Sequence, residues 1–279
     1  MFKSQFYSMI KRRGFYFSFL LVIFISFLYP IILIYQHLLN GFDIASLVDP
    51  RFAFIGSRYT NAWYYMYEYF PLILMFPFAY SYASDKRSHY DCVMISRGGI
   101  KKYLYAKAFC CMIGGFIITF TPMLVNMIVN YVFLPYTSND SSYNSIPEEI
   151  LRFVDNEFYE TKSNDAYLWL ISPKSSILFS AIRIGILGAT FSLVIYVISM
   201  FINNLRFFYF SVLPVLIFFV ASHKIQENRE HNSFSIDIME YATTGSYSAY
   251  NPFFFWIVCG ILILASFIVI FIFTKKDQI

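Results

Sequence analysis

The sequence predicts an all-α integral membrane protein with six transmembrane helices and both ends in the cytoplasm. The chain is 58% hydrophobic and only 14% charged, whereas a soluble domain carries about 25% charged residues. Its apolar residues gather into six long stretches. With the first segment inside, the inward segments hold 13 Lys/Arg against 3 Asp/Glu, and the outward loops hold 7 against 13. An excess of Lys and Arg on the cytoplasmic side sets the orientation of membrane proteins.

The predicted spans form one transmembrane domain, residues 1–279, because no loop is long enough to build a separate core. The fifth span is short and contains Pro214, so it is marginal for a full crossing. The loop after it is predicted to dip back toward the membrane. The first span follows basic residues as in a signal peptide, but its long apolar run lacks a small-residue cleavage site, which predicts an uncleaved span. The spans cover about residues 15–36, 63–83, 108–134, 176–202, 207–222 and 252–274.

Two amphipathic segments are predicted outside the spans. Residues 2–13 place apolar side chains on one helical face and basic side chains mostly elsewhere, which predicts an interfacial helix at the inner surface; a frayed basic tail is the alternative. In the largest outward loop, Ser145 and Glu148 form a capping-box pattern with Pro147 in the first turn. Apolar residues follow at helical spacing, which predicts an outer amphipathic helix that forms a lid on the span ends or rests on lipid.

The sequence has no pattern for nucleotide, metal or nucleic-acid chemistry. It contains neither a P-loop nor an H-E-x-x-H motif, and only His223 and His231 could meet, without placed carboxylates. The net charge of +4 comes from basic residues beside the span ends, where they meet anionic lipid. The sequence therefore predicts membrane lipid as a partner, no nucleic acid, no cofactor or metal in this chain, and no catalytic site.

Polar residues at membrane depth predict helix contacts. Glu68 and Arg183 are the two charges inside the spans, and such residues are often functional. Both lie roughly 8–10 Å from the outer surface by helical rise, which predicts an ion pair that closes the outer mouth of a cavity; independent snorkelling of each is the alternative. Gly114 and Gly115 predict close helix approach in the third span, where Asn126 and Asn130 lie one turn apart on the same face.

The inward loop between spans two and three carries the most specific pattern. Residues 84–107 read SDKRSHYDCVMISRGGIKKYLYAK, with an acid-basic opening, a small apolar group, an S-R-G turn and a Tyr-Leu-x-x-Lys entry to the next span. This loop resembles that of the permease subunits of ABC-2 type transporters. The resemblance implies that Asp85 is the acidic opener, that a coupling helix runs from Tyr90 to Ile95, that Arg97 lies in the turn and that Lys107 anchors span three.

A coupling helix transmits motion by packing on an ATPase. Val93, Met94 and Ile95 would supply its apolar contact, while Tyr90 and Asp91 would fix its register together with the arginine of the turn. The alternative is that the loop is only a positive-inside signal, for which its six basic residues would suffice.

The resemblance implies a permease subunit of an ABC transporter that exports an amphiphilic or hydrophobic cargo, such as an antimicrobial or toxin-like peptide. It would pair with a second permease, identical or paralogous, and with cytoplasmic ATPase subunits that hold ATP and Mg. It would lie in the cell membrane as a multi-pass protein with no enzymatic activity of its own. The alternatives are an ATPase-independent immunity or sensor protein and, less favoured, a membrane enzyme.

Overall fold

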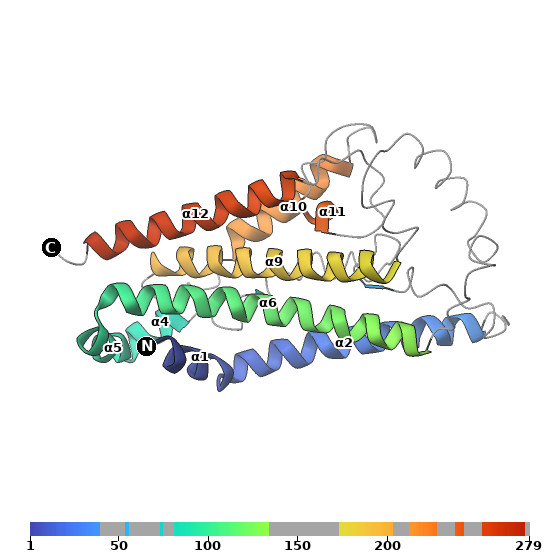
Figure 1. The fold of residues 1–279 in the computed structure, drawn as a ribbon, viewed down its shortest axis with the longest axis horizontal. Helices are drawn as coiled ribbons and strands as arrows, with labels where there is room; N and C mark the ends of the chain where they lie inside the picture. Colours follow the sequence, from blue (N-terminus) through green and yellow to red (C-terminus); the bar gives the residue numbers. More distant parts are fainter. Residues whose placement is uncertain are drawn as a thin grey trace.

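The computed structural model describes residues 1–39, 54–55, 73–74, 81–133, 173–202, 212–227, 238–242 and 253–276. The regular structure in these ranges is helical, without strands. The long helices lie side by side in an elongated bundle (Figure 1). The helices are α1 (Phe2–Ile10), α2 (Arg13–Leu39), α4 (Ser81–Arg87), α5 (Tyr90–Gly98), α6 (Ile100–Phe133), α9 (Pro173–Met200), α10 (Leu213–Glu227), α11 (Ile238–Ala242) and α12 (Phe253–Lys276).

Four helices of the described chain are long and apolar enough to cross a membrane. Their candidate spans are Arg13–Ile32, Ile100–Val132, Lys174–Met200 and Phe253–Lys275, which correspond to predicted spans one, three, four and six. Most of predicted span two lies outside the described residues. Predicted span five is represented by α10, which has 15 residues and is about 22 Å long. That length is less than the roughly 30 Å of a hydrocarbon core.

Three predicted helix boundaries are corrected. The helix of span three begins at Ile100 rather than residue 108, because no glycine or proline interrupts the chain between Gly99 and Lys107. Helix α4 covers the predicted end of span two at residue 83 and ends only at Arg87, inside the predicted loop. The helix of span five continues past residue 222 to Glu227. The 34 residues of α6 make it about 51 Å long, so it extends beyond the bilayer core.

The pair α6 and α9 forms the centre of the bundle, and their backbones approach at glycines. A Cβ atom on Gly115 would lie 2.5 Å from the carbonyl oxygen of Gly188 and 2.6 Å from Cβ of Ser192. Thr119 is one turn along α6, where its Oγ1 donates to the Gly115 carbonyl oxygen at 2.9 Å. The prediction of close approach at Gly115 is confirmed. Small residues permit such backbone contact in membranes.

The short helix α11 fills a position between α9 and the start of α12. Ile238, Met239 and Tyr241 are buried there. The ring of Tyr241 lies 5.2 Å from the ring of Phe254, and the Oγ atom of Ser180 donates to the carbonyl oxygen of residue 242 at 2.7 Å. These three apolar side chains therefore pack on protein helices in the described structure.

Both ends of the chain lie at one end of the bundle, together with α4 and α5 (Figure 1). Helix α1 packs against α6, and α4 packs against α9. The exposed lysines Lys101 and Lys102 begin α6, and Lys275 closes α12. Basic residues thus collect at the end of the bundle that carries the predicted coupling element.

Candidate functional site

The candidate site is a buried ionic cluster centred on Asp85, at the same end of the bundle. Oδ1 of Asp85 lies 3.0 Å from Nη2 of Arg12. Its Oδ2 lies 2.6 Å from Nζ of Lys107 and accepts a hydrogen bond of 2.9 Å from the hydroxyl of Tyr103. These four residues, the Asp85 cluster, join α4, α6 and the junction between α1 and α2.

The charged side chains of the Asp85 cluster are largely buried. The side chain of Lys107 is 0% exposed and that of Asp85 is 7% exposed, whereas that of Arg12 is 18% exposed. A buried charge is costly unless it is paired and hydrogen-bonded. The ammonium of Lys107 also lies 4.9 Å from the ring centroid of Tyr103, within the range of a cation–π contact. Removal of the carboxylate would leave Lys107 buried without its counter-charge.

The cluster arises from local spacing and from one long-range contact. Tyr103 and Lys107 are four residues apart on α6, so their side chains lie on the same face. Asp85 and Lys107 are both predicted site residues of the loop pattern in residues 84–107, and in the structure they are in contact. In the sequence, Arg12 is one of several basic residues before the first span, and Tyr103 belongs to the Tyr-Leu-x-x-Lys pattern. That four-residue spacing is the signal that could have identified Tyr103; no sequence signal singles out Arg12 from its basic neighbours.

Helix α5 is joined to its neighbours by short, defined turns. His89 precedes it with φ of 55°. The Oγ of the neighbouring Ser88 lies 3.1 Å from the carbonyl oxygens of both Ser84 and Asp85, to which its hydroxyl donates. Gly99 ends the helix with φ of 79°, which glycine adopts without steric cost. The predicted turn is therefore corrected: Arg97 and residue 98 belong to the last turn of α5, and the chain reverses at Gly99.

The predicted coupling residues divide between two faces of α5. Tyr90, Val93 and Arg97 are exposed and lie at positions i, i+3 and i+7, so they form one stripe. Met94 is buried, and Ile95 is partly buried against the core. The predicted contact of Val93, Met94 and Ile95 with a partner stays a prediction, and of the three only Val93 is exposed. The burial of Met94 and Ile95 attaches α5 to the rest of the protein.

The remaining predicted coupling residue, Asp91, lies in the first turn of α5. It is neither fully exposed nor fully buried. Met1, which precedes α1, reaches the other end of α5, where a Cβ atom on Gly98 would lie 2.8 Å from its Cε. Because Arg12 follows α1 and binds Asp85, the segment from Met1 to Arg12 contacts both α4 and α5.

Other predicted sites are partly outside the described residues. Arg183 is half-buried on α9, but Glu68 lies outside the described residues, so their pairing stays a prediction. The outer amphipathic helix also lies outside them. Within the described chain, no group of three His, Cys, Asp or Glu side chains is placed to hold a metal ion. The free cysteines Cys110, Cys111 and Cys259 are buried and Cys92 is exposed.

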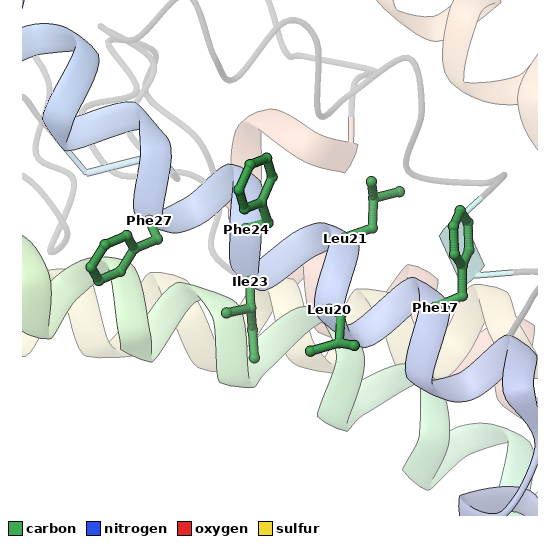
Figure 2. A pocket seen from close by; sticks show the side chains of 6 residues that line it. All are labelled: Phe17, Leu20, Leu21, Ile23, Phe24 and Phe27. Atoms are coloured by element: carbon green, nitrogen blue, oxygen red, sulfur yellow. The ribbon is translucent and has the colours of Figure 1, made fainter.

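Helix α2 carries many exposed apolar side chains. It contains a shallow pocket of about 510 Å³, whose lining residues all belong to α2. Figure 2 shows Phe17, Leu21 and Phe24 on one side of the helix and the other lining side chains on the opposite side. The lining residues are Phe17, Leu20, Leu21, Ile23, Phe24 and Phe27. An apolar surface of this kind suits lipid tails or another hydrophobic molecule.

Comparisons with protein-family models, with curated proteins and with solved structures give no match. The function is therefore inferred from the residues and the geometry of the chain itself.

Proposed function

We propose that the chain is the membrane-spanning permease subunit of an ABC-2 type transporter. It would couple ATP hydrolysis by separate cytoplasmic ATPase subunits, which hold ATP and Mg, to export of an amphiphilic or hydrophobic cargo. The observation that carries the proposal is α5: a short helix at one end of the bundle, attached by Met94 and presenting Tyr90, Val93 and Arg97 outward.

The connections of α5 favour transmission of force. Two residues, Ser88 and His89, separate it from α4, and Gly99 separates it from α6. The Asp85 cluster fixes α4 to α6 and to the junction before α2. Packed elements with short connections move together, because a displacement of one forces its contacts to follow. A partner that pushes α5 would therefore displace α4, α6 and the start of α2.

The exposed side chains of α4 and α5 indicate what kind of surface the ATPase would offer to bind them. Lys86, Arg87 and Arg97 are exposed and basic, whereas Val93 and Tyr90 supply exposed apolar area. Complementary charge gives a protein interface its specificity, and an apolar centre with a polar rim is the usual arrangement. The partner would therefore offer an apolar pocket surrounded by acidic side chains.

The proposal includes six spans, cytoplasmic termini and a second permease subunit in the cell membrane. Both chain ends lie at the basic end of the bundle (Figure 1), which supports the same side for both. The apolar, aromatic surface of α2 (Figure 2) supports a hydrophobic or amphiphilic cargo. An antimicrobial or toxin-like peptide is such a cargo.

Affinity purification of the tagged chain from its native membrane in mild detergent tests the proposal. We expect a P-loop ATPase to co-purify in stoichiometric amount, and the Val93→Asp and Arg97→Glu variants to recover at least about tenfold less ATPase, because each removes one contact type of a docking centre. Lys102→Glu is the matched control, since Lys102 is an exposed basic residue at the same end but outside α5.

Recovery of the chain without an ATPase would refute the transporter proposal and favour the immunity or sensor protein. Equal recovery with all three variants would refute the location of the coupling surface.

A further inference from the structure

One face of α1 carries an exposed stripe of basic and aromatic side chains. Lys3, Tyr7 and Lys11 are spaced four residues apart and are exposed, while Gln5 and Met9 are buried on the opposite face. The side chain of Lys11 lies with Nζ 4.4 Å from the ring centroid of Tyr7. Residues at i, i+4 and i+8 lie above one another on a helix, so the three side chains form one continuous surface, called here the α1 stripe.

Covalent connection places the α1 stripe near the surface of the bilayer. Helix α1 ends at Ile10, and the candidate span of α2 begins at Arg13. Three chain steps cover at most about 11 Å. The end of α1 therefore lies at the depth of the lipid headgroups if α2 crosses the membrane. A short helix with basic and aromatic residues is suited to this layer.

The positive charge of α1 and of the start of α2 favours lipids with anionic headgroups. The first acidic residue of the chain is Asp43, so α1 and α2 contain no carboxylate. Arg12 binds Asp85, but Lys3, Lys11 and Arg13 are exposed. Juxtamembrane lysine and arginine attract anionic lipids. Tyrosine favours the membrane–water interface, and the aliphatic stems of lysine extend along apolar surface while the ammonium reaches the phosphates.

We propose that the α1 stripe, with Arg13, binds the phosphate groups of anionic phospholipids in the adjoining leaflet. The bound headgroups hold α1 in place. The residue before α1, Met1, lies beside Gly98 at the end of α5, and Arg12 after α1 belongs to the Asp85 cluster. The lipid composition of the leaflet thereby sets how firmly α4 and α5 are held. This inference goes beyond the transport proposal and depends only on α2 being a span.

Hydrogen exchange of the full chain tests this inference in nanodiscs of phosphatidylcholine, with and without about one quarter phosphatidylglycerol. We expect amide protection in residues 3–11 to rise in the anionic discs. One lysine near an anionic surface corresponds to about fivefold in affinity. The double variant Lys3→Gln/Lys11→Gln should therefore lose up to about 25-fold of the protection gained.

The matched control is Lys101→Gln/Lys102→Gln, which removes the same charge from exposed lysines at the start of α6. It should keep the lipid-dependent protection of α1. Unchanged protection of α6 and α9 in both double variants shows that each is folded. Equal protection of wild-type α1 in neutral and anionic discs would overturn the inference. Protection that appears only when an ATPase is added would assign the α1 stripe to a protein partner instead.

Discussion

The side-chain amide of Asn126 on α6 donates to the carbonyl oxygen of Ser26 on α2 at 2.9 Å. Ser26 precedes Pro30 by four residues, and Pro30 lies inside α2. Proline has no N–H to donate to the carbonyl four residues earlier. Asn126 therefore supplies the hydrogen bond that Pro30 removes, at a depth where unsatisfied backbone groups are costly.

Both polar atoms of the Asn126 side chain form hydrogen bonds. Its Oδ1 accepts from the backbone N–H of Ile55 at 3.0 Å and from Nδ2 of Asn130 at 3.2 Å. Both asparagines are buried. The amide thus connects α2, α6 and the segment at residue 55, so the buried polar groups of this apolar helix have hydrogen-bond partners.

The first prediction follows from this contact. Asn126→Ala should lower the free energy of unfolding by about 1–2 kcal/mol. In a Pro30→Ala background it should cost less, because the N–H of the new alanine can reach the Ser26 carbonyl within α2. Unfolding in detergent of wild type, both single variants and the double variant gives the coupling energy, expected at about 0.5–1.5 kcal/mol. Strict additivity would show that Asn126 does not replace the missing backbone bond.

The second prediction concerns the Asp85 cluster. Asp85→Ala should destabilise the protein by about 3–5 kcal/mol, because it leaves Lys107 buried without its counter-charge. Adding Lys107→Met should restore part of this loss, since the buried charge is then removed and the volume is kept. Thermal unfolding of the three variants measures the effect. If the double variant is as unstable as the sum of the single variants, the two residues do not act as a pair.

The Asp85 cluster also predicts which of two substitutions destabilises the protein more. Arg12→Gln should cost less than Asp85→Ala, because Arg12 is partly exposed and water screens its charge. Its loss leaves Asp85 paired with Lys107 and hydrogen-bonded to Tyr103. Under the same unfolding conditions, an Arg12→Gln variant at least as unstable as Asp85→Ala would contradict this assignment.

The third prediction concerns the contact between α6 and α9. Gly115→Ala should destabilise the protein by about 1–3 kcal/mol, because its Cβ would overlap the Gly188 backbone. Gly260→Ala on α12 is the control: a Cβ there meets nothing within 4 Å, and alanine favours the helix by up to about 1 kcal/mol. Equal melting temperatures for the two variants would exclude a close contact at Gly115.

The fourth prediction separates the two faces of α5. Met94→Asp should lower stability by several kcal/mol, since it introduces a carboxylate at a buried position. Val93→Asp should leave the melting temperature within about 2 °C, because Val93 is exposed and surface substitutions cost little. Thermal unfolding without any ATPase present distinguishes them. A destabilised Val93→Asp variant would mean that its effect on ATPase recovery cannot be assigned to docking.

The described spans were largely predictable because their signal is local. Long apolar runs and one-sided Lys/Arg residues require no knowledge of neighbouring helices, and the predicted spans that coincide with α6, α9 and α12 depended on these alone. Helix ends were less predictable. The sequence located a turn at residues 97–99, but only the backbone geometry shows that Gly99 takes the positive φ and that Arg97 stays in α5.

What the sequence by itself determined is therefore the helical membrane character of the chain, its basic end, and the spacing that puts Tyr103 and Lys107 on one face. The tertiary structure alone decided that Arg12 joins Asp85 across 73 positions, that Asn126 reaches Ser26 across 100 positions, and that Met94 faces inward. Helical periodicity fixes which side chains share a face. Only the packing of one helix against another decides which face is buried and which distant partner it meets.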